Sequence, residues 1–248
     1  MTTSAPPRPG RLVAVAVLVA LASAGGFAAW WATRAPAPEP EPAPDLARDA
    51  EEYLKARGAV PLSVGLAEVL AAPAPAVPTD RHPLLNQPAP PFALTGADDA
   101  RVELEPLFAR GPVVLVFYYG YSCDHCVAQL FGINKDLRHF TELNATVVAV
   151  SPDTPAHTRA RYAEYGKFGF PVLSDPGRAV AIKYGVFRPA AGDLPKWQAH
   201  GTFVIARDRT VRWANTGPEP FTDTVTLLRE LAAAEGRLPA PPAKGGTP

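Results

Sequence analysis

The sequence predicts an α/β domain with a central mixed sheet flanked by helices, placed behind one N-terminal transmembrane helix. Three observations lead to this prediction. Between residues 92 and 237, short apolar runs alternate with segments whose apolar residues recur at helical spacing. Two strands follow one another near the end of that series, which makes the sheet mixed rather than purely parallel. Residues 12–32 carry no charged side chain.

The composition limits the number of domains and the class of partner. The chain has 248 residues, and its 24 Lys plus Arg balance its 24 Asp plus Glu, so the net charge gives no argument for binding nucleic acid. Most of the 30 prolines lie before residue 92 or after residue 238. The remaining stretch is long enough for one ordinary domain with a single core.

Residues 1–11 are predicted to be a cytoplasmic tail and residues 12–32 a transmembrane anchor. The uncharged stretch is long enough to cross the hydrocarbon core of a bilayer, which is about 30 Å thick. Arg8 and Arg11 precede it, and basic residues favour the cytoplasmic side of a membrane. The prediction is a single-pass protein of the cell membrane whose folded domain lies on the periplasmic side.

A cleaved signal peptide is the alternative for this segment. Residues 12–21 would be its apolar core, and the small residues 22–24 would be its cleavage site. Cleavage would leave the apolar residues 27–32 at the new terminus, so an uncleaved anchor is preferred. Both interpretations export the domain.

Residues 33–82 are predicted to form a Pro/Ala-rich linker with short helices. Residues 35–44 alternate proline with alanine or glutamate, which favours a stiff, extended polyproline II spacer. Asp45 can cap a helix that ends at Gly58, and residues 63–72 can form another helix. Neither helix carries recognisable chemistry, so the linker is expected to hold the domain away from the membrane.

The folded domain is expected to span residues 83–237, followed by a disordered tail over residues 238–248. It begins with a hairpin, because two short alternating segments flank the turn residues 96–99. The further predicted elements are strands over 113–119, 145–150, 171–173, 202–205 and 211–214, and helices over 123–141, 155–167, 178–184 and 222–234. The uninterrupted apolar run over 113–119 is typical of a strand buried on both faces.

The only two cysteines of the chain lie where this strand gives way to a helix. Cys123 and Cys126 follow Gly120, at which the apolar run stops. A thiol at a helix N-terminus meets unpaired backbone N–H groups and the positive end of the helix dipole, which favour the thiolate. A purely structural disulfide is disfavoured, because closing so short a loop removes little entropy from the unfolded chain. The pair is interpreted as a dithiol/disulfide redox centre.

Three tyrosines precede the cysteines. Strand alternation predicts that Tyr119 and Tyr121 share one face of the sheet and that Tyr118 lies on the other. We expect them to pack in the core. Three histidines elsewhere in the chain are expected at the surface: His82, His139 and His157.

Four segments in this order resemble the AhpC/TSA group of redoxins, which are peroxiredoxin-like proteins of the thioredoxin-fold superfamily. They are residues 86–94 (NQPAPPFAL), the strand with its CxxC, residues 170–176 (FPVLSDP) followed by 184–186 (YGV), and residues 201–205 (GTFVI). The resemblance covers roughly residues 83–237. It implies a thioredoxin-like fold in which the cysteines start the first long helix and the loop before Gly201 lies against them.

The resemblance also implies an oxidoreductase, for which two mechanisms are open. The main expectation is a membrane-anchored thiol-disulfide oxidoreductase, in which Cys123 attacks a disulfide of a protein partner and Cys126 resolves the mixed disulfide. The alternative is a thiol peroxidase that reduces hydroperoxides, with Cys126 peroxidatic and Cys123 resolving. In that alignment Tyr119 and Cys123 occupy the Pro and Thr positions of the peroxiredoxin pattern P-x-x-x-T-x-x-C. Both mechanisms need an upstream thiol electron donor and no cofactor.

Two histidines complete the predicted catalytic set. His125, when protonated, would stabilise a neighbouring thiolate, an effect that Asp124 opposes. The resemblance places His200 next to the cysteines, where it can accept a proton or act as a positive neighbour. A copper-binding metallochaperone similar to Sco proteins is the less favoured alternative. Those proteins usually have a C-x-x-x-C spacing, and adjacent His125 and Cys126 would strain a tetrahedral site, so no metal is expected.

Overall fold

The structure is a computed structural model that describes residues 45–58, 62–72 and 77–238. These residues belong to one compact unit that begins at Asp45. The predicted cytoplasmic tail and transmembrane anchor, the first part of the linker and nearly all of the predicted C-terminal tail lie outside the described residues. Among the residues that are described, no helix has the length and apolar character needed to cross a bilayer.

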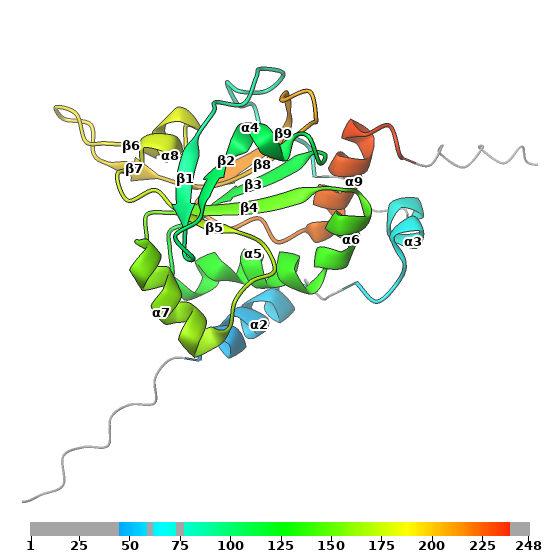
Figure 1. Cartoon of the computed structure of the whole chain (residues 1–248), viewed down its shortest axis with the longest axis horizontal. Helices are drawn as coiled ribbons and strands as arrows, with labels where there is room; N and C mark the ends of the chain where they lie inside the picture. The colour runs from blue at the N-terminus through cyan, green and yellow to red at the C-terminus, as the bar shows by residue number, and fades with distance from the viewer. Residues whose placement is uncertain (1–44, 59–61, 73–76, 239–248) are drawn as a thin grey trace, which may run out of the picture. The chain divides into compact units, whose positions relative to one another are not determined.

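A seven-stranded mixed sheet forms the centre of the domain (Figure 1). Its strands are β1 (Ala93–Gly96), β2 (Arg101–Glu103), β3 (Val113–Phe117), β4 (Thr146–Ser151), β5 (Val172–Ser174), β8 (His200–Ile205) and β9 (Val211–Gly217). Their spatial order is β2-β1-β5-β4-β3-β8-β9. Strands β3, β4 and β5 run parallel to one another, whereas the other pairs are antiparallel. The predicted mixed sheet and its opening hairpin are confirmed.

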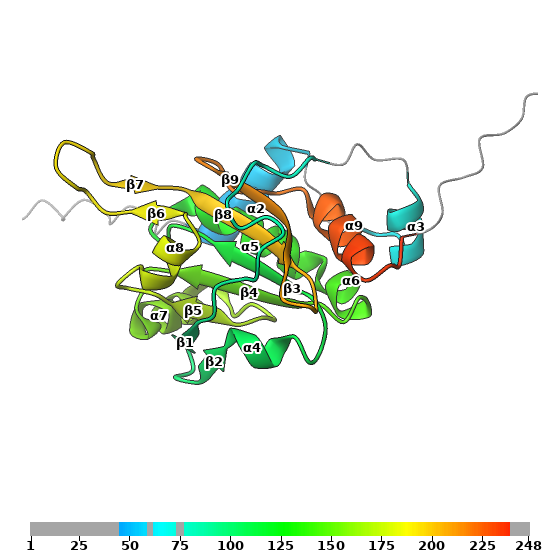
Figure 2. The ribbon, with the colours of Figure 1, turned by 90° about the horizontal axis from the view of Figure 1, so that it is seen from above.

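Helices cover both faces of this sheet. They are α2 (Leu46–Ala56), α3 (Leu66–Ala71), α4 (Leu104–Leu107), α5 (Asp124–Lys135), α6 (Leu137–Glu142), α7 (Pro155–Tyr165), α8 (Ala179–Lys183) and α9 (Thr224–Ala234). The short strands β6 (Phe187–Arg188) and β7 (Trp197–Gln198) pair with each other outside the main sheet. Figure 2 shows them extending from the sheet as a two-stranded arm.

Strand β3 lies near the middle of the sheet, and all five of its residues are buried. Because side chains alternate along a strand, Val114 and Val116 pack with α5, α6 and α9, whereas Val113, Leu115 and Phe117 pack with α4 and α8. Each buried side chain of this size stabilises the fold by about 1.5–3 kcal/mol. The prediction of a strand buried on both faces is confirmed, and the strand rigidly positions the residues that follow it.

Gly120 makes a turn between this strand and the cysteines. Its φ is +105°, a value that favours glycine, and a Cβ atom there would lie 2.7 Å from the carboxylate oxygens of Asp153. The same carboxylate accepts a hydrogen bond of 2.8 Å from the backbone N–H of Tyr121. Tyr121 thereby packs edge-to-face against Tyr118 in one core cluster. The prediction that Tyr121 shares a face with Tyr119 is wrong, because the turn ends the strand alternation.

The helix predicted over residues 123–141 is two helices. Helix α5 ends at Lys135 and α6 begins at Leu137, with Asp136 between them. The buried carboxylate of Asp136 accepts a hydrogen bond of 2.8 Å from the backbone N–H of Leu62. The break therefore lies where the segment that precedes α3 meets the domain.

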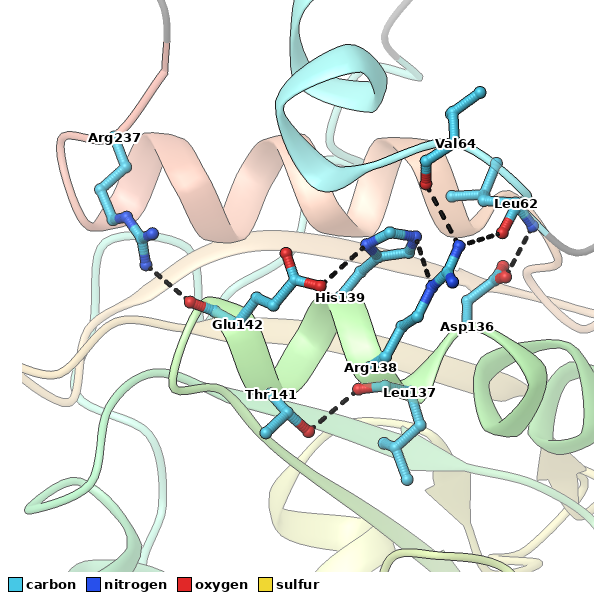
Figure 3. Close-up of polar contacts among 9 residues, drawn as sticks. All are labelled: Leu62, Val64, Asp136, Leu137, Arg138, His139, Thr141, Glu142 and Arg237. Atoms are coloured by element: carbon cyan, nitrogen blue, oxygen red, sulfur yellow. Dashed lines mark hydrogen bonds and ion pairs between the residues drawn. The ribbon is translucent and has the colours of Figure 1, made fainter.

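Polar side chains of α6 fasten that segment to the domain (Figure 3). Arg138 donates hydrogen bonds of 2.8 and 3.2 Å to the carbonyl oxygens of Leu62 and Val64. Its Nε also lies 3.3 Å from Nε2 of His139, which is only 1% exposed. The expectation that His139 lies at the surface is wrong, because Arg138 and the residues before α3 cover it.

Helix α2 has the boundaries that its sequence predicts. The Asp45 side chain accepts a hydrogen bond of 3.1 Å from the backbone N–H of Arg48, which caps the first turn. The chain leaves the helix through Gly58, whose φ is +70°. The prediction of a helix capped by Asp45 and ended by Gly58 is confirmed.

This linker helix packs along α5, the helix that begins after Cys123 (Figure 1). Ala50 and Leu54 are buried against Ala128 of α5. Gly132 allows Leu54 to approach, since a Cβ atom there would lie 3.4 Å from a Leu54 methyl carbon. A part of the chain that was predicted to be a spacer therefore covers the helix that follows the redox pair.

Candidate active site

Cys123 and Cys126 form a disulfide at the N-terminus of α5. Their Cα atoms are 5.2 Å apart, within the range that a disulfide allows. Cys123 immediately precedes the helix and is partly exposed, whereas Cys126 lies in its first turn and is fully buried. The predicted redox pair is thus one bonded unit with one accessible and one inaccessible sulfur.

The imidazole of His125 lies against Cys123. Its Nε2 and Nδ1 atoms are 3.6 and 3.9 Å from the Cys123 Sγ atom, and its side chain is exposed to solvent. A positive charge so close to a cysteine sulfur favours the thiolate over the thiol. The geometry therefore places the His125 imidazole within contact of the Cys123 sulfur.

Within the described part of the chain, this cluster is also the group of side chains best suited to a metal ion. The donor atoms of Cys123, His125 and Cys126 lie within 4.8 Å of one another. Two thiolates and one imidazole suit zinc or copper only when the cysteines are reduced. A closed tetrahedral site needs a fourth ligand, which this cluster does not supply.

Tyr53 of α2 covers the other side of His125. The two rings are stacked, with centroids 5.6 Å apart and planes inclined by 25°. The Tyr53 hydroxyl donates a hydrogen bond of 2.9 Å to Oε2 of Glu219. Burial, and then this hydrogen bond, raise the pKa of Tyr53 to about 12, so the hydroxyl remains a donor at physiological pH. Sequence analysis missed this residue, because an aromatic side chain on a linker helix does not indicate what the helix will contact.

His200 at the start of β8 is buried, with only 2% of its surface exposed. Its ring stacks on Tyr119 with a centroid separation of 4.2 Å and an angle of 24°. Nδ1 lies 3.0 Å from the carbonyl oxygen of Pro218, which can only accept, so Nδ1 carries the proton in the neutral ring. Nε2 is left as an acceptor, and it is buried without a hydrogen-bond partner among the described residues.

Burial holds His200 in its neutral form. The pKa of His200 is lowered to about 4, with desolvation as the largest cause and the neighbouring His125 as a smaller one. The imidazole is therefore uncharged at physiological pH. A neutral ring with a free Nε2 lone pair can accept a proton during a reaction, although the desolvation that keeps it neutral also makes it a weak base.

The loop after β9 contacts both histidine–tyrosine stacks. Pro218 accepts the hydrogen bond of His200, and the next residue, Glu219, accepts that of Tyr53. The Tyr53 hydrogen bond is the largest cause that lowers the pKa of Glu219, and the charge of Arg57 lowers it as well. The loop that contacts both stacks therefore carries an anionic side chain.

A buried hydrogen bond joins α5 to β8 one helical turn after Cys126. The Gln129 side-chain amide donates to the Thr202 hydroxyl over 2.8 Å, and both residues are 1% exposed. Strand β8 in turn pairs with β3, with Gly201 opposite Phe117. These contacts hold the cysteine helix and the strand that carries His200 in one rigid frame. Gln129 belongs to no motif that distinguishes it from other polar residues. Thr202 lies within the GTFVI segment, but that resemblance assigns no role to its hydroxyl.

The structure brings three of the four predicted site residues into direct contact. Cys123, His125 and Cys126 form one cluster. His200 is close enough to His125 for an electrostatic effect between the two rings, and the 218–219 loop contacts both histidine–tyrosine stacks. Among the described residues, no hydrogen bond joins His200 to either sulfur.

Comparison with known proteins identifies the family. Residues 85–214 match the sequence profile of the AhpC/TSA family. A putative peroxiredoxin of Mycobacterium tuberculosis is 36% identical over 108 residues, which cover 44% of this chain and 69% of that protein. A second putative peroxiredoxin of this organism is 30% identical over 146 residues, covering 58% of this chain and 92% of that protein. A chloroplastic peroxiredoxin Q of Sedum lineare is 30% identical over 146 residues, covering 57% and 76%.

Solved structures agree with these relatives. The crystal structure of peroxidoxin BcpB from Mycobacterium tuberculosis superposes with a TM-score of 0.53 at 27% identity, covering 62% of this chain and 98% of that one. A Plasmodium vivax 2-Cys peroxiredoxin shares the fold, with a TM-score of 0.54 at 19% identity over 62% of this chain and 82% of that one. The resemblance inferred from the sequence is confirmed. The chain belongs to the AhpC/TSA family and is a peroxiredoxin-like oxidoreductase of the thioredoxin fold.

Proposed function

We propose that the protein is a thiol peroxidase that reduces hydroperoxides through Cys126 and Cys123. The observation that carries the proposal is the Cys123–Cys126 disulfide within a domain of the AhpC/TSA family. Its relatives include putative peroxiredoxins and peroxiredoxin Q. These similarities favour the peroxidase alternative over the thiol-disulfide oxidoreductase that was the main expectation.

Cys126 is the peroxidatic residue in this proposal and Cys123 the resolving residue. The Cys126 thiolate attacks one peroxide oxygen and breaks the O–O bond, which yields a sulfenic acid and, with one proton, an alcohol or water. The Cys123 thiolate then attacks the sulfenic sulfur and releases hydroxide, which leaves as water with one proton. The product is the Cys123–Cys126 disulfide. A thiol electron donor supplies two electrons and two protons to restore both thiols, attacking first at the accessible Cys123 sulfur.

The two histidines have different proposed roles in this cycle. His200 accepts the proton of the Cys126 thiol at its free Nε2 and returns a proton to the leaving alcohol. Its hydrogen bond to Pro218 supports this role, because it leaves Nε2 unprotonated. His125 stabilises the thiolate of Cys123, the sulfur that it contacts.

Hydroperoxide consumption by the purified full-length chain with a dithiol donor tests the proposal. We expect Cys126→Ser to abolish consumption. Cys123→Ser, reduced and then freed of the donor, should consume about one equivalent and accumulate a sulfenic acid that a dimedone-type probe labels, because a donor thiol would otherwise reduce that sulfenic acid. Ser122→Ala is the matched control, since it changes an exposed neighbour of the pair. Multiple turnovers by the Cys126→Ser variant would overturn the assignment.

Thiol-disulfide exchange with a protein partner is the second candidate. The observation that favours it is the exposure of Cys123, since a bulky protein disulfide can reach only an accessible sulfur. Here Cys123 attacks and Cys126 resolves. Reduction of a model disulfide protein, lost in Cys123→Ser and unaccompanied by peroxide consumption, would replace the first candidate with this one.

We also propose that residues 12–32 anchor the protein in the cell membrane with its domain on the periplasmic side. The proposal is supported by the uncharged length of that segment and by the basic residues before it. Cell fractionation should recover the chain with membranes, and protease added to the periplasmic side should digest the domain. A domain protected from that protease would contradict this orientation.

A further inference from the structure

We infer that Tyr53 is a positioning residue of the redox centre, which holds the His125 imidazole against the Cys123 sulfur. The inference rests on the proposed redox role of the cysteine pair. It concerns α2, which lies before the region that matches the AhpC/TSA family at residues 85–214. The active centre would then include a segment that the family match does not contain.

Two groups of the protein hold His125. Its ring nitrogens lie 3.6 and 3.9 Å from the Cys123 Sγ atom, and its ring stacks on that of Tyr53. His125 is exposed in the first turn of its helix, where a side chain without a tertiary contact samples several rotamers. The stack with Tyr53 favours the rotamer that contacts the sulfur.

Tyr53 itself is held in place by two polar contacts. Its hydroxyl and the guanidinium group of Arg57 both bind Oε2 of Glu219, at 2.9 and 2.7 Å. The Arg57 guanidinium also lies 4.6 Å from the centre of the Tyr53 ring. Arg57 and Glu219 are exposed, and exposed ion pairs add little stability. The effect of these contacts is therefore to orient the Tyr53 ring.

Tyr53 is one of several side chains that dock α2 on α5. Ala50 and Leu54 form a buried apolar contact with Ala128 of α5, and Tyr53 packs against this cluster. An ion pair of 2.9 Å between Glu51 and Lys135 joins the same two helices. Because the contacts of Ala50, Leu54 and Glu51 remain in a Tyr53→Ala variant, α2 should stay docked. Whether a change in cysteine reactivity runs through His125 is then decided by combining substitutions at the two positions.

Alkylation of reduced Cys123 by iodoacetamide, measured across pH, tests the inference. The full-length chain carries Cys126→Ser, so that Cys123 is its only thiol. We expect Tyr53→Ala to slow alkylation at pH 7 about threefold to tenfold and to shift the pH profile upward, because a freed imidazole spends less time beside the sulfur. Tyr53→Phe keeps the ring and should recover most of the rate.

A double-mutant cycle identifies the route of the effect. His125→Ala should slow alkylation at least as much as Tyr53→Ala, and adding Tyr53→Ala to His125→Ala should cause no further loss. Glu51→Ala is the matched control. Glu51 lies on α2, as Tyr53 does, and its substitution breaks the ion pair with Lys135 of α5 without removing a contact to His125. This variant should keep the parent rate.

Either of two results would overturn the inference. One is a folded Tyr53→Ala variant, judged by its circular dichroism and melting curve, with the parent rate and pH profile. The other is a Tyr53→Ala effect that adds fully to that of His125→Ala. Alkylation uses no peroxide, so the two proposals can fail separately. A Tyr53 effect without peroxide turnover would overturn only the peroxidase, and turnover without a Tyr53 effect would overturn only the positioning role.

Discussion

Two histidine–tyrosine stacks belong to the candidate site. Their inter-ring angles are alike, but their ring centroids are 5.6 Å apart for His125 and Tyr53 and 4.2 Å apart for His200 and Tyr119, and they differ in burial. The planes of His125 and Tyr53 meet at 25°, and those of His200 and Tyr119 meet at 24°. His125 is exposed to solvent, whereas His200 is 2% exposed. The same pair of ring types is therefore placed in two different dielectric environments.

The difference shows how burial can divide proton chemistry between two identical side chains. Desolvation lowers the pKa of His200 to about 4, so this ring is a neutral acceptor at physiological pH. His125 lies in solvent with its ring nitrogens 3.6 and 3.9 Å from the Cys123 sulfur, where a positive charge would stabilise the thiolate. The structure thus places a proposed base in the buried stack and a proposed cation beside Cys123 in the exposed one. Four predictions test this division.

The largest expected effect is on stability. Because the pKa of His200 is depressed from about 6.5 in the unfolded chain to about 4, the unfolded state binds more protons between these values, and stability falls as pH decreases through that window. The loss attributable to His200 is about 3 kcal/mol. Urea unfolding at several pH values should show this slope reduced in His200→Gln and kept in His125→Gln. If the free energy of unfolding changed with pH to the same extent in both variants, burial of His200 would not account for the pH dependence.

The next effect is on the reaction with peroxide. His200→Gln removes the Nε2 acceptor and should lower the second-order rate constant with hydroperoxide about 100-fold, the lower range for a general base. Stopped-flow mixing of reduced protein with peroxide measures this constant. A parent-like value, with Cys126→Ser inactive, would show that the buried stack is structural.

A smaller effect is expected from the exposed stack. His125→Gln should slow disulfide formation about tenfold, because the Cys123 thiolate loses its positive neighbour. It should slow this step more than the preceding peroxide step, which uses Cys126. Mass spectrometry of rapidly quenched samples separates sulfenic acid from disulfide. If His125→Gln slowed the peroxide step and disulfide formation equally, the separate roles proposed for the two histidines would be contradicted.

The smallest effect is expected at the loop that joins the stacks. Glu219→Ala removes the acceptor of the Tyr53 hydroxyl but leaves the Pro218 carbonyl that binds His200. Since the Glu219 carboxylate is exposed, we expect only about a twofold slowing of Cys123 alkylation. Asp208→Ala, which breaks an exposed contact to Arg212 elsewhere, is the matched control. A larger loss in the peroxide step than in alkylation would mean that the loop acts mainly on His200.

Local patterns predicted much of the fold. The apolar run at residues 113–119 corresponds to β3, and Asp45 and Gly58 bound α2 as their residue types indicate. Patterns failed where a tertiary contact broke the regular repeat. The Gly120 turn against Asp153 moved Tyr121 to the face of Tyr118, and the contact of Asp136 with Leu62 accompanies the break between α5 and α6.

Residues close together in the chain are sufficient to predict most strands of the main sheet, the family and the cysteine pair at a helix N-terminus. They do not predict α4, the β6–β7 pair or the division between α5 and α6. Which tyrosine stacks on which histidine, and which histidine is buried, depends on long-range packing. Tyr53 contacts His125 because α2 packs on α5. His200 is shielded from solvent in a strand, β8, that pairs with the central strand β3. Burial and long-range contacts depend on the packing of whole elements, and that packing sets the proton chemistry proposed for the site.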